Sequence, residues 1–327
     1  MEVIEDVSKS LWDQVANDCA YATFFHTFEW ASFFAGTYPN RYRIGTKAFR
    51  FDADDWMILP LMETGSDLKG LFKQYYSNIP GVYGGFISNK GLDRRKISAA
   101  MAYLENPRIS TITVFGNPFV ENVGFGASWI KRPEFTHCID LKKFRNEEDL
   151  KRSYYRTTRQ EINKCERAQF SVSRVQSIEE VRDYYGIYLQ ALDRWGKAAT
   201  SKYDLSLFEN IFKSKSDGIN FWLIKKDSKI VGGSLVFSQG KYCVEWHCAY
   251  LQEYFKLGVR KYLTHYMIAD ALWRGFHVYD FNPSGGHSGS AQFKEDFGAQ
   301  KRAFDCYQRD HNIFKLYRKV KRLIPAI

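Results

Sequence analysis

The sequence lacks any cysteine pattern of the kind that holds a metal ion or a disulfide framework. Its six cysteines form no C-x-x-C pair, and no paired-histidine spacing accompanies them. This excludes the common zinc sites and a dense disulfide scaffold. We therefore expect no metal, reduced thiols and a cytoplasmic protein.

Long apolar stretches and a phosphate-loop motif are also missing. The longest strongly apolar run, Trp56 to Met62, contains Pro60 and is too short to span a bilayer. The first residues, MEVIEDVSKSLWDQ, are acidic and lack the apolar core of a signal peptide. No G-x-x-x-x-G-K pattern occurs, so the glycines are expected to shape turns. We expect a soluble protein in which any membrane contact is peripheral.

Aromatic residues and positive charge are abundant. The 327 residues are 17% aromatic and 45% hydrophobic, which indicates a well-packed globular protein, and this length predicts two domains. A composition shift near Asp140 to Asn146 sets the expected domains at 1–145 and 146–327. The net charge of +10 favours an anionic partner such as a nucleic acid, a phosphorylated substrate or a membrane surface, although surplus lysine also keeps proteins soluble.

The order of predicted elements indicates the fold class. In the first half, residues 42–51 and 56–63 predict a β-hairpin. In the second half, Ser177 to Glu180 is a capping box that opens a helix reaching about Trp195. A three-stranded antiparallel meander follows, then a loop with Gly258, a helix, a short strand and a last β-run, at 220–226, 230–237, 242–250, 260–274, 277–281 and 302–307. This order is typical of an α/β acyltransferase core of the GNAT type.

A helix dense in positive charge is predicted at the start of the second domain, in the segment DLKRSYYRTTRQEINKCERA. Arg152, Arg156, Arg159 and Asn163 recur on one helical face, and Tyr155 lies on another. Such a face either contacts phosphate groups or is simply solvated, and the pattern leaves both interpretations open.

The segment GFHVYDFNPSGGHSGSAQFKEDFG, from Gly275 to Gly298, is the most informative part of the chain. A β-rich run ends at Asp280 and opens into a loop from Asn282 to Gly289, which leads to Lys294 between two aromatic residues. Polar groups at a strand end, a loop and one lysine indicate an active-site wall. The alternative is a strand, a surface loop and a helix whose Phe293 and Phe297 face the core.

These motifs resemble those of the FemABX-like branch of the GNAT superfamily, which comprises peptidoglycan-bridge aminoacyltransferases and related acyl-CoA-type acetyltransferases. The resemblance covers most of the chain. It implies an α/β fold of tandem GNAT-like domains, with mixed, mostly antiparallel sheets flanked by helices. The residues that carry it are Phe28-Glu29-Trp30, Arg159 with Ile162 and Lys164, Gly275, Tyr279-Asp280-Phe281, Phe293-Lys294 and Phe297-Gly298.

The resemblance implies that Lys294 lies at the reaction centre, where its ammonium stabilises a developing oxyanion. A salt bridge to Asp280 or Glu295 is the other role that a lysine here can have. The residues expected to bind substrate are Asp280, Asn282, Phe293 and Phe297 in the motif, and Tyr155, Arg156 and Arg159 on the basic helix.

Two titratable residues are candidates for the catalytic base. Strict alternation along the run 242–250 places Glu245 and His247 on one face, opposite a face that looks like the core side. Either residue can take the proton of an attacking amine, directly or through water, and a solvated polar face is the alternative.

The acyl donor is expected to be either aminoacyl-tRNA or acyl-CoA, and no permanently bound cofactor is expected. GNAT enzymes that use acyl-CoA hold its pyrophosphate at a helix N-terminus, usually with an R/Q-x-x-G-x-G/A loop. The matching stretch, Tyr254 to Val259, keeps Gly258 but has no leading Arg or Gln, with Lys256, Arg260 and Lys261 nearby. The positive charge of the chain favours aminoacyl-tRNA.

The acceptor is expected to be an amine-bearing sugar, peptide or small metabolite. Peptidoglycan-type members carry a lysine shortly after the first-domain tryptophan, whereas Trp30 is followed here by Ala-Ser-Phe-Phe, which does not favour a UDP-linked muropeptide. The tail FKLYRKVKRLIPAI predicts a basic C-terminal helix that packs on its domain, or contacts tRNA or an anionic membrane. A catalytically silent RNA- or envelope-binding protein is the alternative to an acyltransferase.

Overall fold

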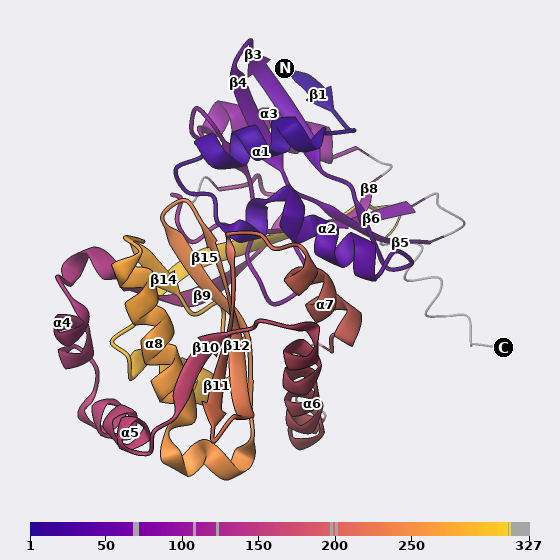
Figure 1. Ribbon diagram of the computed structural model, residues 1–327. Helices are drawn as coiled ribbons and strands as arrows, with labels where there is room; N and C mark the ends of the chain where they lie inside the picture. Colours follow the sequence, from indigo (N-terminus) through magenta and orange to yellow (C-terminus); the bar gives the residue numbers. More distant parts are fainter. Residues whose placement is uncertain are drawn as a thin grey trace. The chain divides into compact units, whose positions relative to one another are not determined.

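The computed structural model describes residues 1–67, 72–106, 109–121, 124–196, 199, 202–312 and 314. The basic C-terminal tail, except for Phe314, lies outside these residues. Contacts divide the chain into two compact units, Met1–Phe135 with Arg302–Ile327, and Thr136–Lys301 (Figure 1). The division into tandem domains at residue 145 stays a prediction.

The first unit contains two sheets. Strands β1, β3, β4 and β7 form one sheet, and β15, β8, β6, β5 and β2 are paired in that order in the other. Helix α3 contributes the buried side chains Ile97, Met101 and Leu104 to the core between these elements. The bounds are β1 Glu2–Ile4, α1 Lys9–Asp18, α2 Phe28–Thr37, β2 Tyr42–Ile44, β3 Lys47–Asp52, β4 Asp55–Leu59, β5 Met62–Asp67, β6 Phe72–Tyr76, β7 Ile87–Ser88, α3 Arg94–Leu104, β8 Ile109–Phe115 and β15 Gln300–Asp310.

The predicted hairpin of the first unit exists as β3 and β4, but each predicted strand is split in two. Residues 42–51 divide into β2 and β3, and residues 56–63 into β4 and β5, with the partners of each pair in different sheets. Pro60 lies at the second break, where its missing N–H cannot serve a sheet ladder. The short strands therefore turn from one sheet to the other.

The second unit is built around a sheet in which β10, β11, β12, β13, β14 and β9 are neighbours in that order. All these pairs are antiparallel except β13 with β14. Helix α6 covers one face and α8 the other (Figure 1). The bounds are β9 Ile130–Asp140, α4 Glu147–Arg152, α5 Arg156–Arg167, β10 Ser171–Arg174, α6 Ile178–Trp195, α7 Leu205–Lys213, β11 Ile219–Lys226, β12 Lys229–Gln239, β13 Tyr242–Tyr250, α8 Val259–Trp273, β14 Val278–Asp280 and α9 Ser288–Glu295.

Local sequence signals explain several of these elements. The Ser177 side chain accepts a hydrogen bond from the Glu180 N–H at the start of α6, which confirms the predicted cap. The meander β11–β12–β13 is also confirmed. The predicted basic helix, however, is interrupted at residues 153–155, because the Tyr155 N–H bonds to the Asp296 carbonyl rather than continuing the helix.

Candidate active site

Lys294 lies on α9 with its side chain almost completely buried, at 4% exposure. Its ammonium donates to the Asn282 carbonyl at 2.6 Å and to the Ser284 hydroxyl at 2.7 Å. Glu295 pairs instead with His137 and Lys301. The alternative role of Lys294 in a salt bridge to Glu295 is therefore wrong, and the ammonium is held by the loop that follows β14.

Asp280, the last residue of β14, fixes that loop. One carboxylate oxygen accepts hydrogen bonds from the Thr136 hydroxyl at 2.5 Å and from the Asn282 N–H at 2.9 Å. Asn282 adopts a left-handed backbone conformation with φ of 62°. Residues other than glycine rarely take this conformation, and asparagine is among those that tolerate it best. Asp280 thus helps to position Lys294 through Asn282. The Asn282 N–H donates to Asp280, and the Asn282 carbonyl accepts a hydrogen bond from the Lys294 ammonium.

The two aromatic residues around Lys294 have different surroundings. Phe297 is fully buried and packs against Tyr154 and Phe281, with ring centroids 4.9 and 5.9 Å away. Phe293 is partly buried and lies under the guanidinium of Arg260 at 3.8 Å. Phe297 therefore anchors α9 to the core, whereas Phe293 faces a cation.

Burial controls the charge of Lys294. It lowers the pKa of the ammonium to about 8, and the Arg260 charge also lowers it, while Asp280 and Glu245 act in the opposite direction. A lysine with such a pKa is cationic at neutral pH but titrates within the working range of an enzyme. This combination of burial and nearby carboxylates is typical of a functional site.

Glu245, on β13, is the second titratable group at this position. Its carboxylate accepts hydrogen bonds from the Ser234 hydroxyl at 3.2 Å and the Tyr279 hydroxyl at 3.3 Å. Burial raises the pKa of this carboxyl, and Arg260 and Lys294 are the charges that partly offset the effect. The structure therefore brings Glu245 close to Lys294.

His247 is not on the same face of β13, so the prediction of one shared face is wrong. Val236 pairs with Glu245 and Leu235 with His247, which leaves Trp246 as an extra residue in a β-bulge. His247 faces α6, where Tyr184 hydrogen-bonds its Nδ1 at 2.6 Å. Burial lowers the pKa of His247 to about 3, so this imidazole is neutral at neutral pH.

The segment expected to bind the donor leads into α8. Gly258 has φ of 79°, and a Cβ there would lie 2.9 Å from the Glu161 backbone, so only glycine fits. Lys256 is exposed, while Lys261 is held by Glu161 at 3.0 Å and Asp296 at 3.5 Å. Of the three cations near this loop, only Arg260 turns toward Lys294.

The basic helix reaches the site through its first turn. Arg156 and Tyr155 are exposed, and Arg159 donates to the carbonyls of Arg152 and Tyr154. Because the helix is interrupted, Arg152 belongs to α4 and does not share a face with the α5 arginines, contrary to prediction. Tyr155 bonds to the Asp296 backbone, so α5 begins beside the end of α9.

Three residues hydrogen-bond within the site although no role was predicted for them. Ser284 lies in the predicted loop, and Tyr279 in the predicted strand, but nothing in the sequence connects them to Lys294 or Glu245. Thr136 is 144 residues from Asp280 in the chain. Only the pairing of β9 with β14 brings them together.

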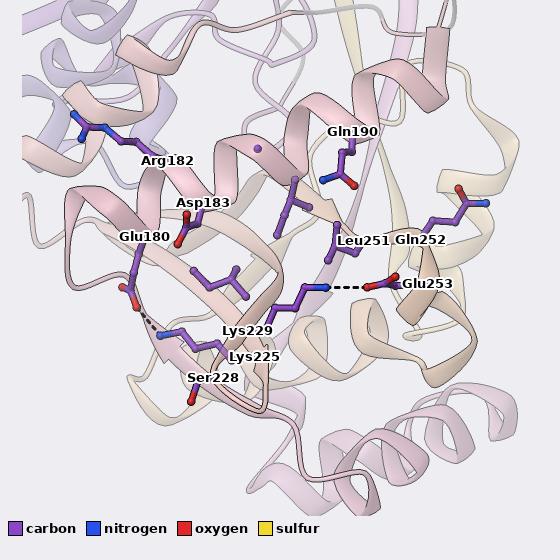
Figure 2. A pocket seen from close by; sticks show the side chains of 13 residues that line it. Glu180, Arg182, Asp183, Gln190, Lys225, Ser228, Lys229, Leu251, Gln252 and Glu253 are labelled. Atoms are coloured by element: carbon purple, nitrogen blue, oxygen red, sulfur yellow. Dashed lines mark hydrogen bonds and ion pairs between the residues drawn. The ribbon is translucent and has the colours of Figure 1, made fainter.

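A separate groove of about 780 Å³ lies between α6, the β11–β12 turn and the segment after β13 (Figure 2). Ion pairs join Glu180 to Lys225 at 2.5 Å and Lys229 to Glu253 at 3.1 Å. Figure 2 shows both pairs on its wall. Its charged lining is balanced, with Glu180, Asp183 and Glu253 against Arg182, Lys225 and Lys229, and it shares no residue with the Lys294 cluster.

Residues 152–295, which include Glu245, Arg260 and Lys294, match the model of the acetyltransferase (GNAT) domain. The predicted GNAT-type α/β fold and the acyltransferase class are thereby confirmed.

Solved structures extend the likeness in fold to the whole chain. FemX is 14% identical with a TM-score of 0.73, over 98% of this chain and 100% of its own. L-PGS from Bacillus licheniformis is 13% identical with a TM-score of 0.60, over 100% of both chains. The C-terminal domain of a putative lysylphosphatidylglycerol synthetase from Agrobacterium fabrum is 10% identical with a TM-score of 0.59, over 98% of this chain and 100% of its own. The predicted FemABX-like resemblance is confirmed at the level of fold.

A search of curated proteins finds no match to the chain. Within the described ranges, none of the helices has both the length and the apolarity to cross a membrane. The same ranges contain no cluster of three or more His, Cys, Asp or Glu residues suited to a metal ion.

Proposed function

We propose that this protein transfers an acyl group to an amine-bearing acceptor and so forms an amide, with aminoacyl-tRNA as the donor. The observation that carries the proposal is the buried Lys294 of the F-K-x-x-F-G motif, which spans Phe293 to Gly298. Two of its three N–H groups are held by Asn282 and Ser284, which leaves one for a reacting oxygen. The acceptor is an amino sugar, a peptide or a small metabolite.

The chemistry matches these residues. The acceptor nitrogen attacks the carbonyl carbon of the donor, a C–N bond forms, and the carbonyl oxygen becomes an oxyanion beside Lys294. Collapse of this intermediate breaks the bond to the ester oxygen of tRNA or the sulfur of CoA. The nitrogen loses one proton and the leaving group gains one, so no oxidant or reductant is required.

Glu245 is the proposed acceptor of the amine proton. Its carboxylate is buried with Ser234 and Tyr279, and burial raises the pKa of this carboxyl, which makes it a stronger base. His247 faces α6 and has a pKa of about 3, so it is the weaker candidate for this role.

The α5 basic face, defined as Arg156, Arg159, Lys164 and Arg167, supports an RNA donor. In the part of the chain that the structure describes, none of the four forms an ion pair with a carboxylate; Arg159 and Lys164 bond to backbone carbonyls. Tyr155, at 54% exposure, stands at its start beside α9. Cations without such ion pairs, three of them exposed, next to an exposed aromatic ring suit a nucleic-acid backbone and a stacked base.

Acyl-CoA is the second candidate donor, because the matched domain is of the acetyltransferase type and α8 begins at a left-handed Gly258. The N–H groups of a helix's first turn bind phosphate well. The loop before Gly258 nevertheless lacks the Arg or Gln that usually leads it. Contact of the C-terminal tail with a membrane, and a cytoplasmic location, stay predictions.

A transfer assay with defined donors tests the proposal. Labelled aminoacyl-tRNA and labelled acetyl-CoA are each offered with a panel of amines, with and without RNase. RNase-sensitive amide formation supports the RNA donor, and RNase-insensitive transfer from acetyl-CoA supports the alternative. If neither donor is consumed while RNA still binds, the protein is a binding module and the proposal fails.

Lys294→Ala should lower turnover by about 100-fold or more, the usual effect of losing an oxyanion donor. Lys213→Ala, which removes a lysine that is 60% exposed on α7, is the matched control and should leave turnover unchanged. Circular dichroism and melting curves establish that both variants fold. Turnover of Lys294→Ala within a few-fold of the parent would remove Lys294 from the reaction centre.

A further inference from the structure

Arg260 lies within the Lys294 cluster although it belongs to another helix. It is in the first turn of α8, and its guanidinium stacks on the Phe293 ring at 3.8 Å. Phe293 is the residue immediately before Lys294. The planar face of the guanidinium is therefore covered by the F-K-x-x-F-G motif, and its edge with the N–H groups remains for another partner.

In the part of the chain that the structure describes, the Nε–H on that edge has no protein acceptor. The Nε atom of Arg260 is buried without a hydrogen-bond partner, and across the ranges that the structure describes Arg260 forms no ion pair within 4.0 Å. Lys261, the next residue, is held by Glu161 and Asp296. A buried donor without an acceptor is unusual in folded proteins and indicates a ligand or a bound water.

Two cations, Arg260 and Lys294, share this region with the carboxylates of Glu245 and Asp280. The Arg260 charge partly offsets the rise that burial causes in the pKa of Glu245, and it adds to the lowering of the pKa of Lys294, so the three groups interact electrostatically. Two cations, Arg260 and Lys294, thus stand on neighbouring helices and repel each other. An anionic group placed beside them relieves this repulsion and satisfies the guanidinium edge.

We propose that Arg260 binds an anionic group of the substrate, a carboxylate or a phosphate, beside Lys294. That this anion belongs to the substrate rests on the proposed function, whereas the binding of an anion at Arg260 does not. Both groups present paired oxygens that match the planar guanidinium fork. A carboxylate would come from an amino-acid or peptide acceptor, and a phosphate from the donor.

Two small anions, phosphate and acetate, added as their sodium salts, serve as probes of this site. Each is titrated at constant ionic strength into the wild type and three variants, and binding is followed by calorimetry and melting temperature. Arg260→Met removes the charge, and Arg260→Lys keeps it without the fork. Arg194→Met is the matched control, because Arg194 also stacks on a phenylalanine ring, that of Phe255 at 5.0 Å, away from Lys294.

We expect the wild type and Arg194→Met to bind one of the probes equally well. Arg260→Met should weaken that binding by about tenfold or more, and Arg260→Lys by less, because hydrogen bonds to a charged group are removed. Phosphate binding assigns the anion to the donor, and acetate binding assigns it to the acceptor. If Arg260→Met does not fold, the test rests on Arg260→Lys, which should bind the probe more weakly than the wild type.

Three results would overturn the inference: no saturable binding of either probe to the wild type, equal binding to wild type and both Arg260 variants, or an equal loss in Arg194→Met. The outcome is separate from that of the transfer assay. Anion binding that depends on Arg260 without any transfer would refute the proposed function alone. Transfer by a protein in which Arg260→Met changes neither probe binding nor KM would refute the role of Arg260 alone.

Discussion

Lys294 carries its positive charge where burial opposes it. The pKa is about 8 in the folded protein against an ordinary value of 10.5. The folded state therefore holds its ammonium at a cost of about 3 kcal/mol below pH 8, and this cost is relieved as pH rises from 8 to 10.5. A residue kept at this expense, with two fixed hydrogen bonds, is better explained by chemistry than by stability.

The same pKa predicts how activity depends on pH. Because the oxyanion is stabilised only by the cationic form, turnover should fall as pH rises through about 8. In Lys294→Arg the guanidinium stays charged, so its remaining activity should not show this falling limb. The measurement is kcat against pH from 6 to about 9.5 with an acceptor whose amine is unprotonated throughout. A limb near pH 8 in both proteins would mean that another group titrates.

Among single residues, the sequence singles out those that we propose to react, but not the residues that hydrogen-bond to them. Lys294 stands out between two aromatics, and Glu245 on a predicted central strand. Ser284 and Thr136 do not, because a hydroxyl becomes a partner only through the fold around it. The orientation of Arg260 toward Phe293, rather than toward the loop at Gly258, is likewise a property of the packed helices and not of the local sequence.

The connection between β14 and α9 acts as one element that positions the lysine. Thr136 on β9 holds Asp280, Asp280 holds the Asn282 N–H, and the Asn282 carbonyl receives Lys294. The left-handed Asn282 is strained relative to extended backbone, so the hydrogen bonds on both sides of it keep the loop in place. Thr136 is thus a positioning residue for Lys294.

Removing the Thr136 hydroxyl should therefore weaken catalysis. Thr136→Val is expected to lower kcat by about tenfold, the effect of removing one hydrogen bond to a charged group, and Thr136→Ser should restore most of it. The falling limb of the pH profile should move to lower pH in Thr136→Val. A less firmly held Asp280 stabilises the ammonium less, and the pKa of Lys294 therefore falls. Thr158→Val, at another fully buried threonine, is the control. Equal losses in both valine variants would point to packing alone.

Elements with strong local signals are predicted correctly, and those shaped by distant contacts are not. The cap of α6 and the meander β11–β13 follow from neighbouring residues. The bulge at Trp246 and the break at residues 153–155 depend on β12 and on Asp296 respectively. The bulge matters most for the site, since it turns Glu245 and His247 to opposite faces of β13.

The cations of the molecule differ in whether a carboxylate neutralises them. The net charge is +10, yet many surface cations are paired, such as Arg145 with Asp149 and Arg152 with Glu148. The α5 basic face differs because its cations lack acidic partners in the region that the structure describes. Binding of a polyanion should therefore concentrate there.

Salt dependence measures that binding directly. Arg156→Gln with Arg167→Gln should weaken tRNA binding and reduce the slope of log K against log salt by about two, one for each phosphate that is no longer neutralised. Arg145→Gln with Arg152→Gln removes the same charge from paired positions and should change the slope little. Binding isotherms from 50 to about 300 mM salt make the comparison. Equal slopes for both double variants would leave the α5 face merely solvated.

The path of the chain through its two units has a consequence for how the protein is made. The second unit, Thr136–Lys301, is continuous in sequence, whereas strand β8 of the first unit pairs with β15, most of which is synthesised after the second unit. During synthesis on the ribosome, β8 cannot pair with β15 until the whole second unit has emerged. The second unit, which carries Lys294, can therefore fold first, and the first unit is completed only after β15 has emerged.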